Sequence, residues 1–149
     1  MSTLITQKAT RRDVERWRRI YAQNRDRLTP NRISGTELER YFVEKYAPQP
    51  FPDADFVSVV EGNLLDNDVH REKLPAGAQP DVAAYRLPND VLVGIDRTTG
   101  FFHVECADIR RAAAVWDDLF VRRGLDARDA DNFVTTAQYL LLTQRRPHA

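Results

Sequence analysis

The segment 91–106 (VLVGIDRTTGFFHVEC) predicts two antiparallel strands joined by a tight turn, and it constrains the fold more than any other part of the chain. With residues 97–100 as the loop, the pairs on one face are all apolar: Ile95 with Phe102, Val93 with Val104 and Val91 with Cys106. A continuous apolar surface of this kind is expected to be buried. Gly100 supports the register, because the last loop residue commonly adopts a left-handed backbone that glycine tolerates.

The opposite face of the same ribbon has a different chemistry. It pairs Asp96 with Phe101, Gly94 with His103 and Leu92 with Glu105. An imidazole therefore lies over a residue that has no side chain, and we expect this face to be open to a ligand or partner. The predicted partner-binding residues are Leu92, Asp96, Phe101, His103 and Glu105.

Length and composition are those of an ordinary globular domain. The 149 residues suffice for one α+β domain with its own core, and we expect residues 1–9 and 146–149 to be disordered tails. The N-terminus lacks the apolar stretch of a signal peptide, and no apolar run approaches the roughly 20 residues that span a bilayer. We therefore expect a cytosolic protein that has no membrane partner.

The first half of the chain is expected to begin with two helices. The first covers about residues 11–27, and the second starts at a capping signature formed by Ser34 and Glu37. The three prolines of residues 48–52 exclude a helix or an internal strand there. Residues 55–60 resemble a first strand, and the polar stretch 61–73 has no clear assignment.

The second half is expected to add strands and then helices. Residues 82–87 predict another strand, and turn residues at 88–90 lead into the hairpin. A helix capped by Asp108 is expected to end at Gly124, and a last helix to begin at Asp126. The sequence thus predicts a small antiparallel sheet of three to four strands, with two N-terminal and two C-terminal helices packed on one face.

Charge is segregated along the chain although its formal sum is zero. Residues 1–50 carry 11 basic and 6 acidic residues, residues 51–108 carry 4 and 11, and residues 109–149 carry 7 and 5. Clustered carboxylates can mask a basic partner through complementary charge. Our leading hypothesis is a protein-binding module that neutralises or regulates a basic partner, such as a nucleic-acid-active toxin, in the manner of an immunity protein or antitoxin.

An enzymatic alternative rests on the histidines, whose ordinary pKa suits proton transfer near neutral pH. Metal-independent cleavage of RNA needs a base, an acid and a cation on the phosphate. His103, His70 and Glu105 are the candidates for the catalytic groups, provided that His70 approaches the hairpin. The residues favour a non-enzymatic role, since no phosphate-binding, dinucleotide-binding or metalloprotease motif is present.

A second alternative is nucleic-acid binding by the first helix. Seven arginines lie among residues 11–27, and Arg12, Arg16 and Arg19 are the candidates for phosphate contacts. We expect no cofactor and no metal site. Cys106 is the only cysteine, and the acidic residues around Asp66 lack the glycine and terminal glutamate of a calcium-binding EF-hand loop.

Overall fold

The computed structural model describes residues 33–66, 68–106 and 108–123, together with the single positions 12, 15, 19 and 23. The chain divides into two compact units, one formed by residues 33–104 and the other by residues 1–32 with 105–149. That residues 1–149 form a single domain remains a prediction. The predicted tails lie outside the described residues.

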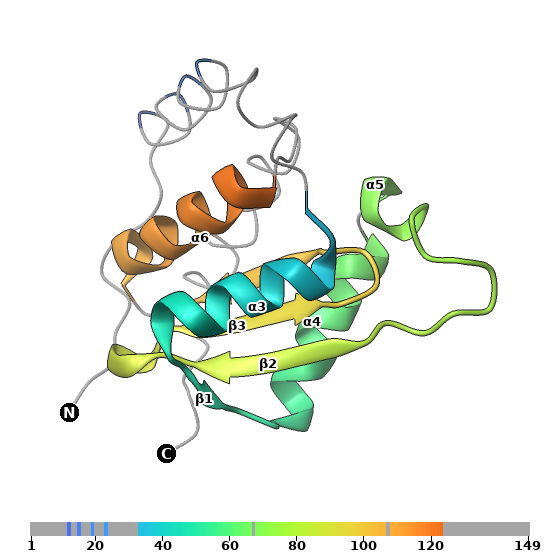
Figure 1. The fold of residues 1–149 in the computed structure, drawn as a ribbon, viewed down its shortest axis with the longest axis horizontal. Coiled ribbons are helices and arrows are strands. Elements are labelled where there is room, and N and C mark those ends of the chain that lie inside the picture. Colours follow the sequence, from blue (N-terminus) through green and yellow to red (C-terminus); the bar gives the residue numbers. More distant parts are fainter. Residues whose placement is uncertain are drawn as a thin grey trace. The chain divides into compact units, whose positions relative to one another are not determined.

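A four-stranded antiparallel sheet forms the centre of the unit 33–104 (Figure 1). Its strands are β1 Gln49–Pro50, β2 Val82–Arg86, β3 Leu92–Asp96 and β4 Phe102–Glu105, in the spatial order β1-β2-β3-β4. The short 3-10 helix η1 Pro88–Asp90 turns the chain between β2 and β3. The predicted strand at 82–87, the turn at 88–90 and the hairpin are therefore confirmed. The proline-rich segment 48–52 contributes only the two-residue edge strand β1, as its missing N–H donors require.

The hairpin has the register that the sequence predicts. The Asp96 N–H donates to the Phe101 carbonyl at 2.8 Å, and the Gly100 N–H donates to the Asp96 carbonyl at 2.8 Å. Gly100 has a φ of 77°, in the left-handed region that the loop requires. The loop consequently closes over residues 97–100.

Helix α3 Gly35–Tyr46 begins at the predicted cap, where the Ser34 hydroxyl accepts a hydrogen bond from the Glu37 N–H at 3.2 Å. Its buried face includes Phe42, whose ring centroid lies 5.7 Å from that of Tyr85. Tyr85 is opposite Val93 in the sheet, so α3 covers the face that carries Val93 and Ile95.

Helix α4 Ala54–Asp66 overturns the prediction of a strand at residues 55–60. The Asp53 carboxylate accepts a hydrogen bond from the Phe56 N–H at 2.8 Å, which caps the helix. Phe56, Val60 and Leu64 follow one helical turn apart, and all are buried. The β-branched residues Val57, Val59 and Val60 favour a strand locally, but the burial of Phe56, Val60 and Leu64 against the sheet determines the helix.

α4 covers the second face of the sheet. A Cβ atom added to Gly94 would lie 2.5 Å from Cγ2 of Val60, so this strand and helix approach closely. Phe56, Val60 and Leu64 form one core cluster with Leu92 and Phe101. Helices therefore lie on both faces (Figure 1), and the prediction that they pack on one face only is wrong for this unit. The short helix α5 Asp68–Arg71 follows α4, and residues 72–81 lead to β2.

The described part of the other unit contains α6 Ile109–Arg123. The Ala112 N–H donates to the Asp108 carbonyl at 3.1 Å, which agrees with the predicted start. Its apolar residues at helical spacing are buried: Ala112, Ala113, Trp116, Leu119 and Phe120. Positions 12, 15, 19 and 23 are helical and exposed, as a helix over 11–27 predicts, while the rest of that segment and the predicted helix from Asp126 lie outside the described residues.

Within the part of the chain that the structure describes, no helix is both long and apolar enough to cross a membrane.

Candidate functional site

The predicted partner-binding face lies in the interior. Leu92 is 7% exposed, Phe101 9% and His103 4%, because α4 packs over them. Asp96 is completely buried, and Glu105 is half-buried. The expectation that this side of the hairpin is open is therefore wrong, because α4 covers it, whereas the sequence predicts a strand at residues 55–60 and no element that would cover this face.

The two candidate catalytic histidines are core residues. His103 Nδ1 lies 3.1 Å from the Asn63 side-chain nitrogen, and the His103 ring packs 5.9 Å from the ring of Phe56. His70 is 1% exposed and meets the ring of Phe101 at 5.2 Å and 72°. A general acid or base must come within hydrogen-bond reach of its substrate. In this fold neither imidazole is accessible to an RNA strand.

Asp96 organises the hairpin turn. Its Oδ1 accepts a hydrogen bond from the Asp81 N–H at 2.6 Å, and its Oδ2 accepts from the Thr99 N–H at 2.8 Å and the Thr99 hydroxyl at 2.6 Å. A buried carboxylate is tolerated when hydrogen bonds of this kind compensate its lost hydration. The role of Asp96 is therefore to shape the turn rather than to meet a partner.

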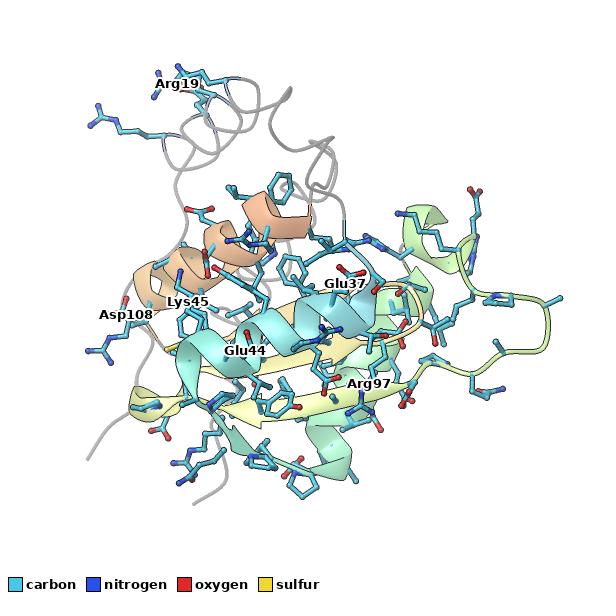
Figure 2. The ribbon with its side chains drawn as sticks, in the orientation of Figure 1. Arg19, Glu37, Glu44, Lys45, Arg97 and Asp108 are labelled. Carbon is cyan, nitrogen blue, oxygen red and sulfur yellow. The ribbon has the colours of Figure 1, made fainter. Side chains whose placement is uncertain are left out.

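A polar cluster of Glu39, Asp81, Tyr85 and Arg97 joins α3 to the sheet. The Arg97 guanidinium donates to both carboxylate oxygens of Glu39, at 2.6 and 2.8 Å, and to Asp81 at 3.3 Å. The Tyr85 hydroxyl donates to Glu39 at 2.5 Å. Figure 2 shows Arg97 at the surface of the unit, where its side chain remains 41% exposed. The Glu39 carboxylate consequently links α3 to β2 and to the hairpin loop.

The ionisation of this cluster reflects its geometry. The hydrogen bonds from Arg97 lower the pKa of Glu39 below its ordinary value of 4.5, against the opposing effect of burial, and the Tyr85 hydroxyl lowers it further. Burial raises the pKa of Tyr85 to about 12, and the Glu39 carboxylate adds to that rise. Glu39 also raises the pKa of Arg97. At neutral pH the cluster is therefore a carboxylate that is held by a guanidinium and a phenol.

The exposed residues of α4 include no basic residue. We call them the outer face of α4, which consists of Ala54, Asp55, Ser58, Gly62, Leu65 and Asp66. Ser58 and Gly62 lie one turn apart along its centre, with both carboxylates on one side and Leu65 on the other. Leu65 is 44% exposed. The face is therefore narrow, acidic on one edge and apolar on the other.

The exposed face of α3 provides a comparison within the same unit. It carries charges of both signs, including Glu37, Arg40, Glu44 and Lys45, three of which Figure 2 labels. Mixed signs are usual on a helix that meets only water. The outer face of α4 departs from this pattern because all of its charged residues are carboxylates.

Within the part of the chain that the structure describes, no neighbouring atom requires a glycine at position 62. A Cβ atom at this position would meet nothing within 4 Å. A glycine inside a helix destabilises it by about 1 kcal/mol relative to alanine. Glycine is however useful where another backbone must approach closely.

The candidate nucleic-acid residues are partly described. Arg12 and Arg19 are helical and exposed, as are Glu15 and Gln23. Arg16 lies outside the described residues. Among the residues that the structure describes, no group of three or more His, Cys, Asp or Glu side chains is placed to share a metal ion.

The outer face of α4 was not identified from the sequence. The sequence does contain a helix pattern here. Asp53 is a suitable N-terminal cap after Pro52, and apolar residues follow at intervals of four: Phe56, Val60 and Leu64. A helix there would have placed Ser58 and Gly62 opposite the apolar stripe. In a strand, by contrast, side chains alternate between the two faces, so this arrangement does not arise.

No protein-family model matches the chain, and searches among curated proteins and solved structures likewise find no match.

Proposed function

We propose that this chain is a cytosolic protein-binding module whose acidic unit, residues 33–104, neutralises or regulates a basic partner. A nucleic-acid-active protein such as a toxin is the kind of partner that this chemistry suits, since proteins that bind phosphates carry basic surfaces. The contact surface in this proposal is the outer face of α4, which replaces the buried hairpin residues of the sequence-based hypothesis.

One observation carries the proposal: an exposed helix face that holds carboxylates, no basic residue and an unconstrained glycine. The charge of the unit supports it. Residues 33–104 contain 12 acidic and 6 basic residues, a formal charge of −6, and the rest of the chain carries +6. A surface of one sign attracts the opposite sign over about a Debye length, close to 10 Å at 0.1 M salt.

The test is an affinity capture in which the immobilised full chain is incubated with a lysate of the cells that produce it. We expect it to retain a basic protein that is released by about 0.5 M salt, where screening is strong. Asp55→Asn/Asp66→Asn is expected to lower the affinity for that protein, once identified and purified, by about tenfold, since each lost charge contact contributes a fraction of a kcal/mol to more than 1 kcal/mol.

Glu37→Gln/Glu44→Gln is the matched control, because it removes the same number of charges from the exposed face of α3. Equal weakening by the two double variants would show that net charge matters and the outer face of α4 does not. An acidic or neutral captured protein would contradict the proposed function itself.

A second candidate is nucleic-acid binding, favoured by the exposed Arg12 and Arg19 in the unit of positive formal charge. If these residues contact phosphates, Arg12→Ala/Arg19→Ala should weaken binding of RNA or DNA and reduce the salt dependence by about two phosphate contacts. Fluorescence anisotropy with labelled oligonucleotides measures both. An unchanged salt slope would remove this candidate.

A further inference from the structure

We propose that the prolines of residues 48–52 close the exposed edge of the sheet to strand addition by a second copy of this chain. Pro48, Pro50 and Pro52 occupy alternate positions in this segment. The proposal goes beyond the proposed function, because it concerns contacts between copies and involves neither the outer face of α4 nor a basic partner.

The sheet of the unit 33–104 ends in two edge strands, β1 and β4, and they differ in exposure. In β4, Phe102 is 5% exposed, and His103 and Val104 are 4% exposed. Both residues of β1 are exposed. An exposed edge presents backbone N–H and C=O groups that can pair with a strand of another molecule. Of the two edges, β1 is therefore the one at which strand addition must be prevented.

The pairing of β1 with β2 shows which way the backbone of this edge points. The two strands are antiparallel, with Pro50 opposite Tyr85. The Phe51 N–H donates to the Ala84 carbonyl at 2.9 Å. In an antiparallel pair, successive residues point their backbone groups alternately toward the partner strand and away from it. An N–H group at position 50 would consequently point away from β2, but proline has none.

Positions 48 and 52 follow the same alternation in an extended chain, and both are also proline. The prolines therefore remove donors on the outward side only, and the hydrogen bond from Phe51 to β2 is kept. Sheets tolerate proline at edge positions of this kind. A second copy of the same edge lacks the same donors, so two such edges cannot form a ladder of hydrogen bonds with each other.

The composition of the segment explains why protection is needed. Residues 46–52 (YAPQPFP) contain two aromatic side chains and no charged residue. Uncharged segments of about six or seven residues with strand-forming side chains and no proline are typical of cross-β stacking. Lys45 and Asp53 flank the segment, as charged residues often flank an apolar strand. Within residues 46–52, the prolines are the feature that opposes stacking.

Sedimentation velocity of the full chain tests the proposal with the variant Pro48→Val/Pro50→Val, which adds two outward N–H donors to each copy. The variant should associate at concentrations at least about tenfold lower than the wild type does, because a two-fold contact gains donors from both copies. Hydrogen exchange followed by mass spectrometry should show that the amides of residues 46–53 become protected as the variant associates.

Two further variants separate the edge from a general effect of losing prolines. Pro75→Val/Pro88→Val is the matched control, because it removes two exposed prolines that lie outside the strands. Pro48→Val/Pro50→Lys provides the same outward donors but adds a charge to the edge, and like charges on two copies oppose pairing. Both variants should associate no more than the wild type does.

Circular dichroism checks that each variant is folded. If Pro48→Val/Pro50→Val does not fold, Pro50→Val alone is measured in the same way and should shift association in the same direction. The proposal is overturned if the folded edge variant associates at the same concentrations as the wild type, or if the matched control associates equally. Association that leaves residues 46–53 unprotected would also overturn it, because the contact would then lie elsewhere.

Discussion

At the scale of single residues, Gly94 and Val60 illustrate how closely α4 approaches the sheet. A Cβ atom at Gly94 would lie 2.5 Å from Val60 Cγ2 and 3.1 Å from Cγ1. Both atoms belong to a short side chain that is completely buried. The contact explains why the centre of β3 has no side chain on this face.

We predict that Gly94→Ala lowers the free energy of unfolding by about 1–3 kcal/mol through overpacking. Val60→Ala alone should also destabilise, by about 1–3 kcal/mol, through a cavity. The double variant should be more stable than the sum of the two losses by at least about 1 kcal/mol, because the removed methyl groups make room for the new one. Urea unfolding of the four proteins measures this coupling, and additive losses would contradict the contact.

Ala47 offers a second residue-scale prediction. It follows α3 with a φ of 44°, and its N–H donates to the Val43 carbonyl at 2.9 Å, so it occupies a left-handed C-terminal cap. Ala47→Gly should raise the free energy of unfolding by about 0.5–1 kcal/mol, since glycine adopts this conformation without the Cβ penalty. Gly77, at a φ of 79°, is the reverse control: Gly77→Ala should destabilise in the same urea assay.

At the scale of elements, the polar cluster connects α3 to the hairpin. Glu39 receives two hydrogen bonds from Arg97 and one from Tyr85. Because the folded-state pKa of Glu39 is lowered, its contribution to stability is present above the ordinary pKa of 4.5 and is lost as the pH falls through the lowered value. Protonation of Glu39 therefore loosens the junction of α3 with the loop at Arg97.

We predict that Glu39→Gln destabilises the protein by about 1 kcal/mol at pH 7, a modest value because Arg97 is partly exposed. The variant should lose less stability than the wild type as the pH is lowered below 4.5. Urea unfolding at a series of acidic pH values compares the two. If the unfolding free energies of the two proteins fall equally with pH, Glu39 does not contribute to the loss of stability in acid.

Tyr85 gives the opposite dependence at alkaline pH. Its pKa is raised from 10.0 to about 12, so its contribution is complete below pH 10 and is lost as the pH rises through 12. Tyr85→Phe should remove this part of the alkaline loss of stability, while the ring contact with Phe42 remains. The rise in absorbance near 295 nm, where a phenolate absorbs and a neutral phenol does not, follows tyrosine ionisation, and the difference between the wild type and Tyr85→Phe isolates Tyr85.

Elements differed in how far the sequence determined them. The hairpin was predictable to its register, because the alternating pattern and Gly100 specify the same loop. The α3 cap at Ser34 was predictable for a similar reason. Residues 55–60 were not, since their β-branched side chains suit a strand and their helical form depends on burial of Phe56 and Val60 against β3. Because residues 55–60 were predicted as a strand, the candidate site was placed on the hairpin face, which α4 in fact covers.

At the scale of the whole molecule, local stability should vary strongly along the unit 33–104. Every residue of β3 is buried, and β3 lies between β2 and β4. Residues 72–77 are mostly exposed, and the loop extends from α5 to β2 (Figure 1). Hydrogen bonds of central strands open only when the structure unfolds more globally, whereas exposed loops open locally.

We predict that the amides of β3 exchange with solvent deuterium at the rate set by global unfolding, and that those of residues 72–79 exchange first. Hydrogen exchange followed by mass spectrometry measures both. Gly94→Ala should accelerate exchange in β3 and leave residues 72–79 unchanged. Equal protection of the two segments would be inconsistent with the central position of β3.

The carboxylate of Asp96 has a consequence for how the chain folds. Two of the three hydrogen bonds that it accepts come from Thr99, three residues along the chain, so this part of the turn can form before any distant segment arrives. The third comes from the N–H of Asp81, fifteen residues earlier in the chain. The hairpin can therefore serve as an early nucleus, and replacing Thr99 would slow refolding more than it would hasten unfolding.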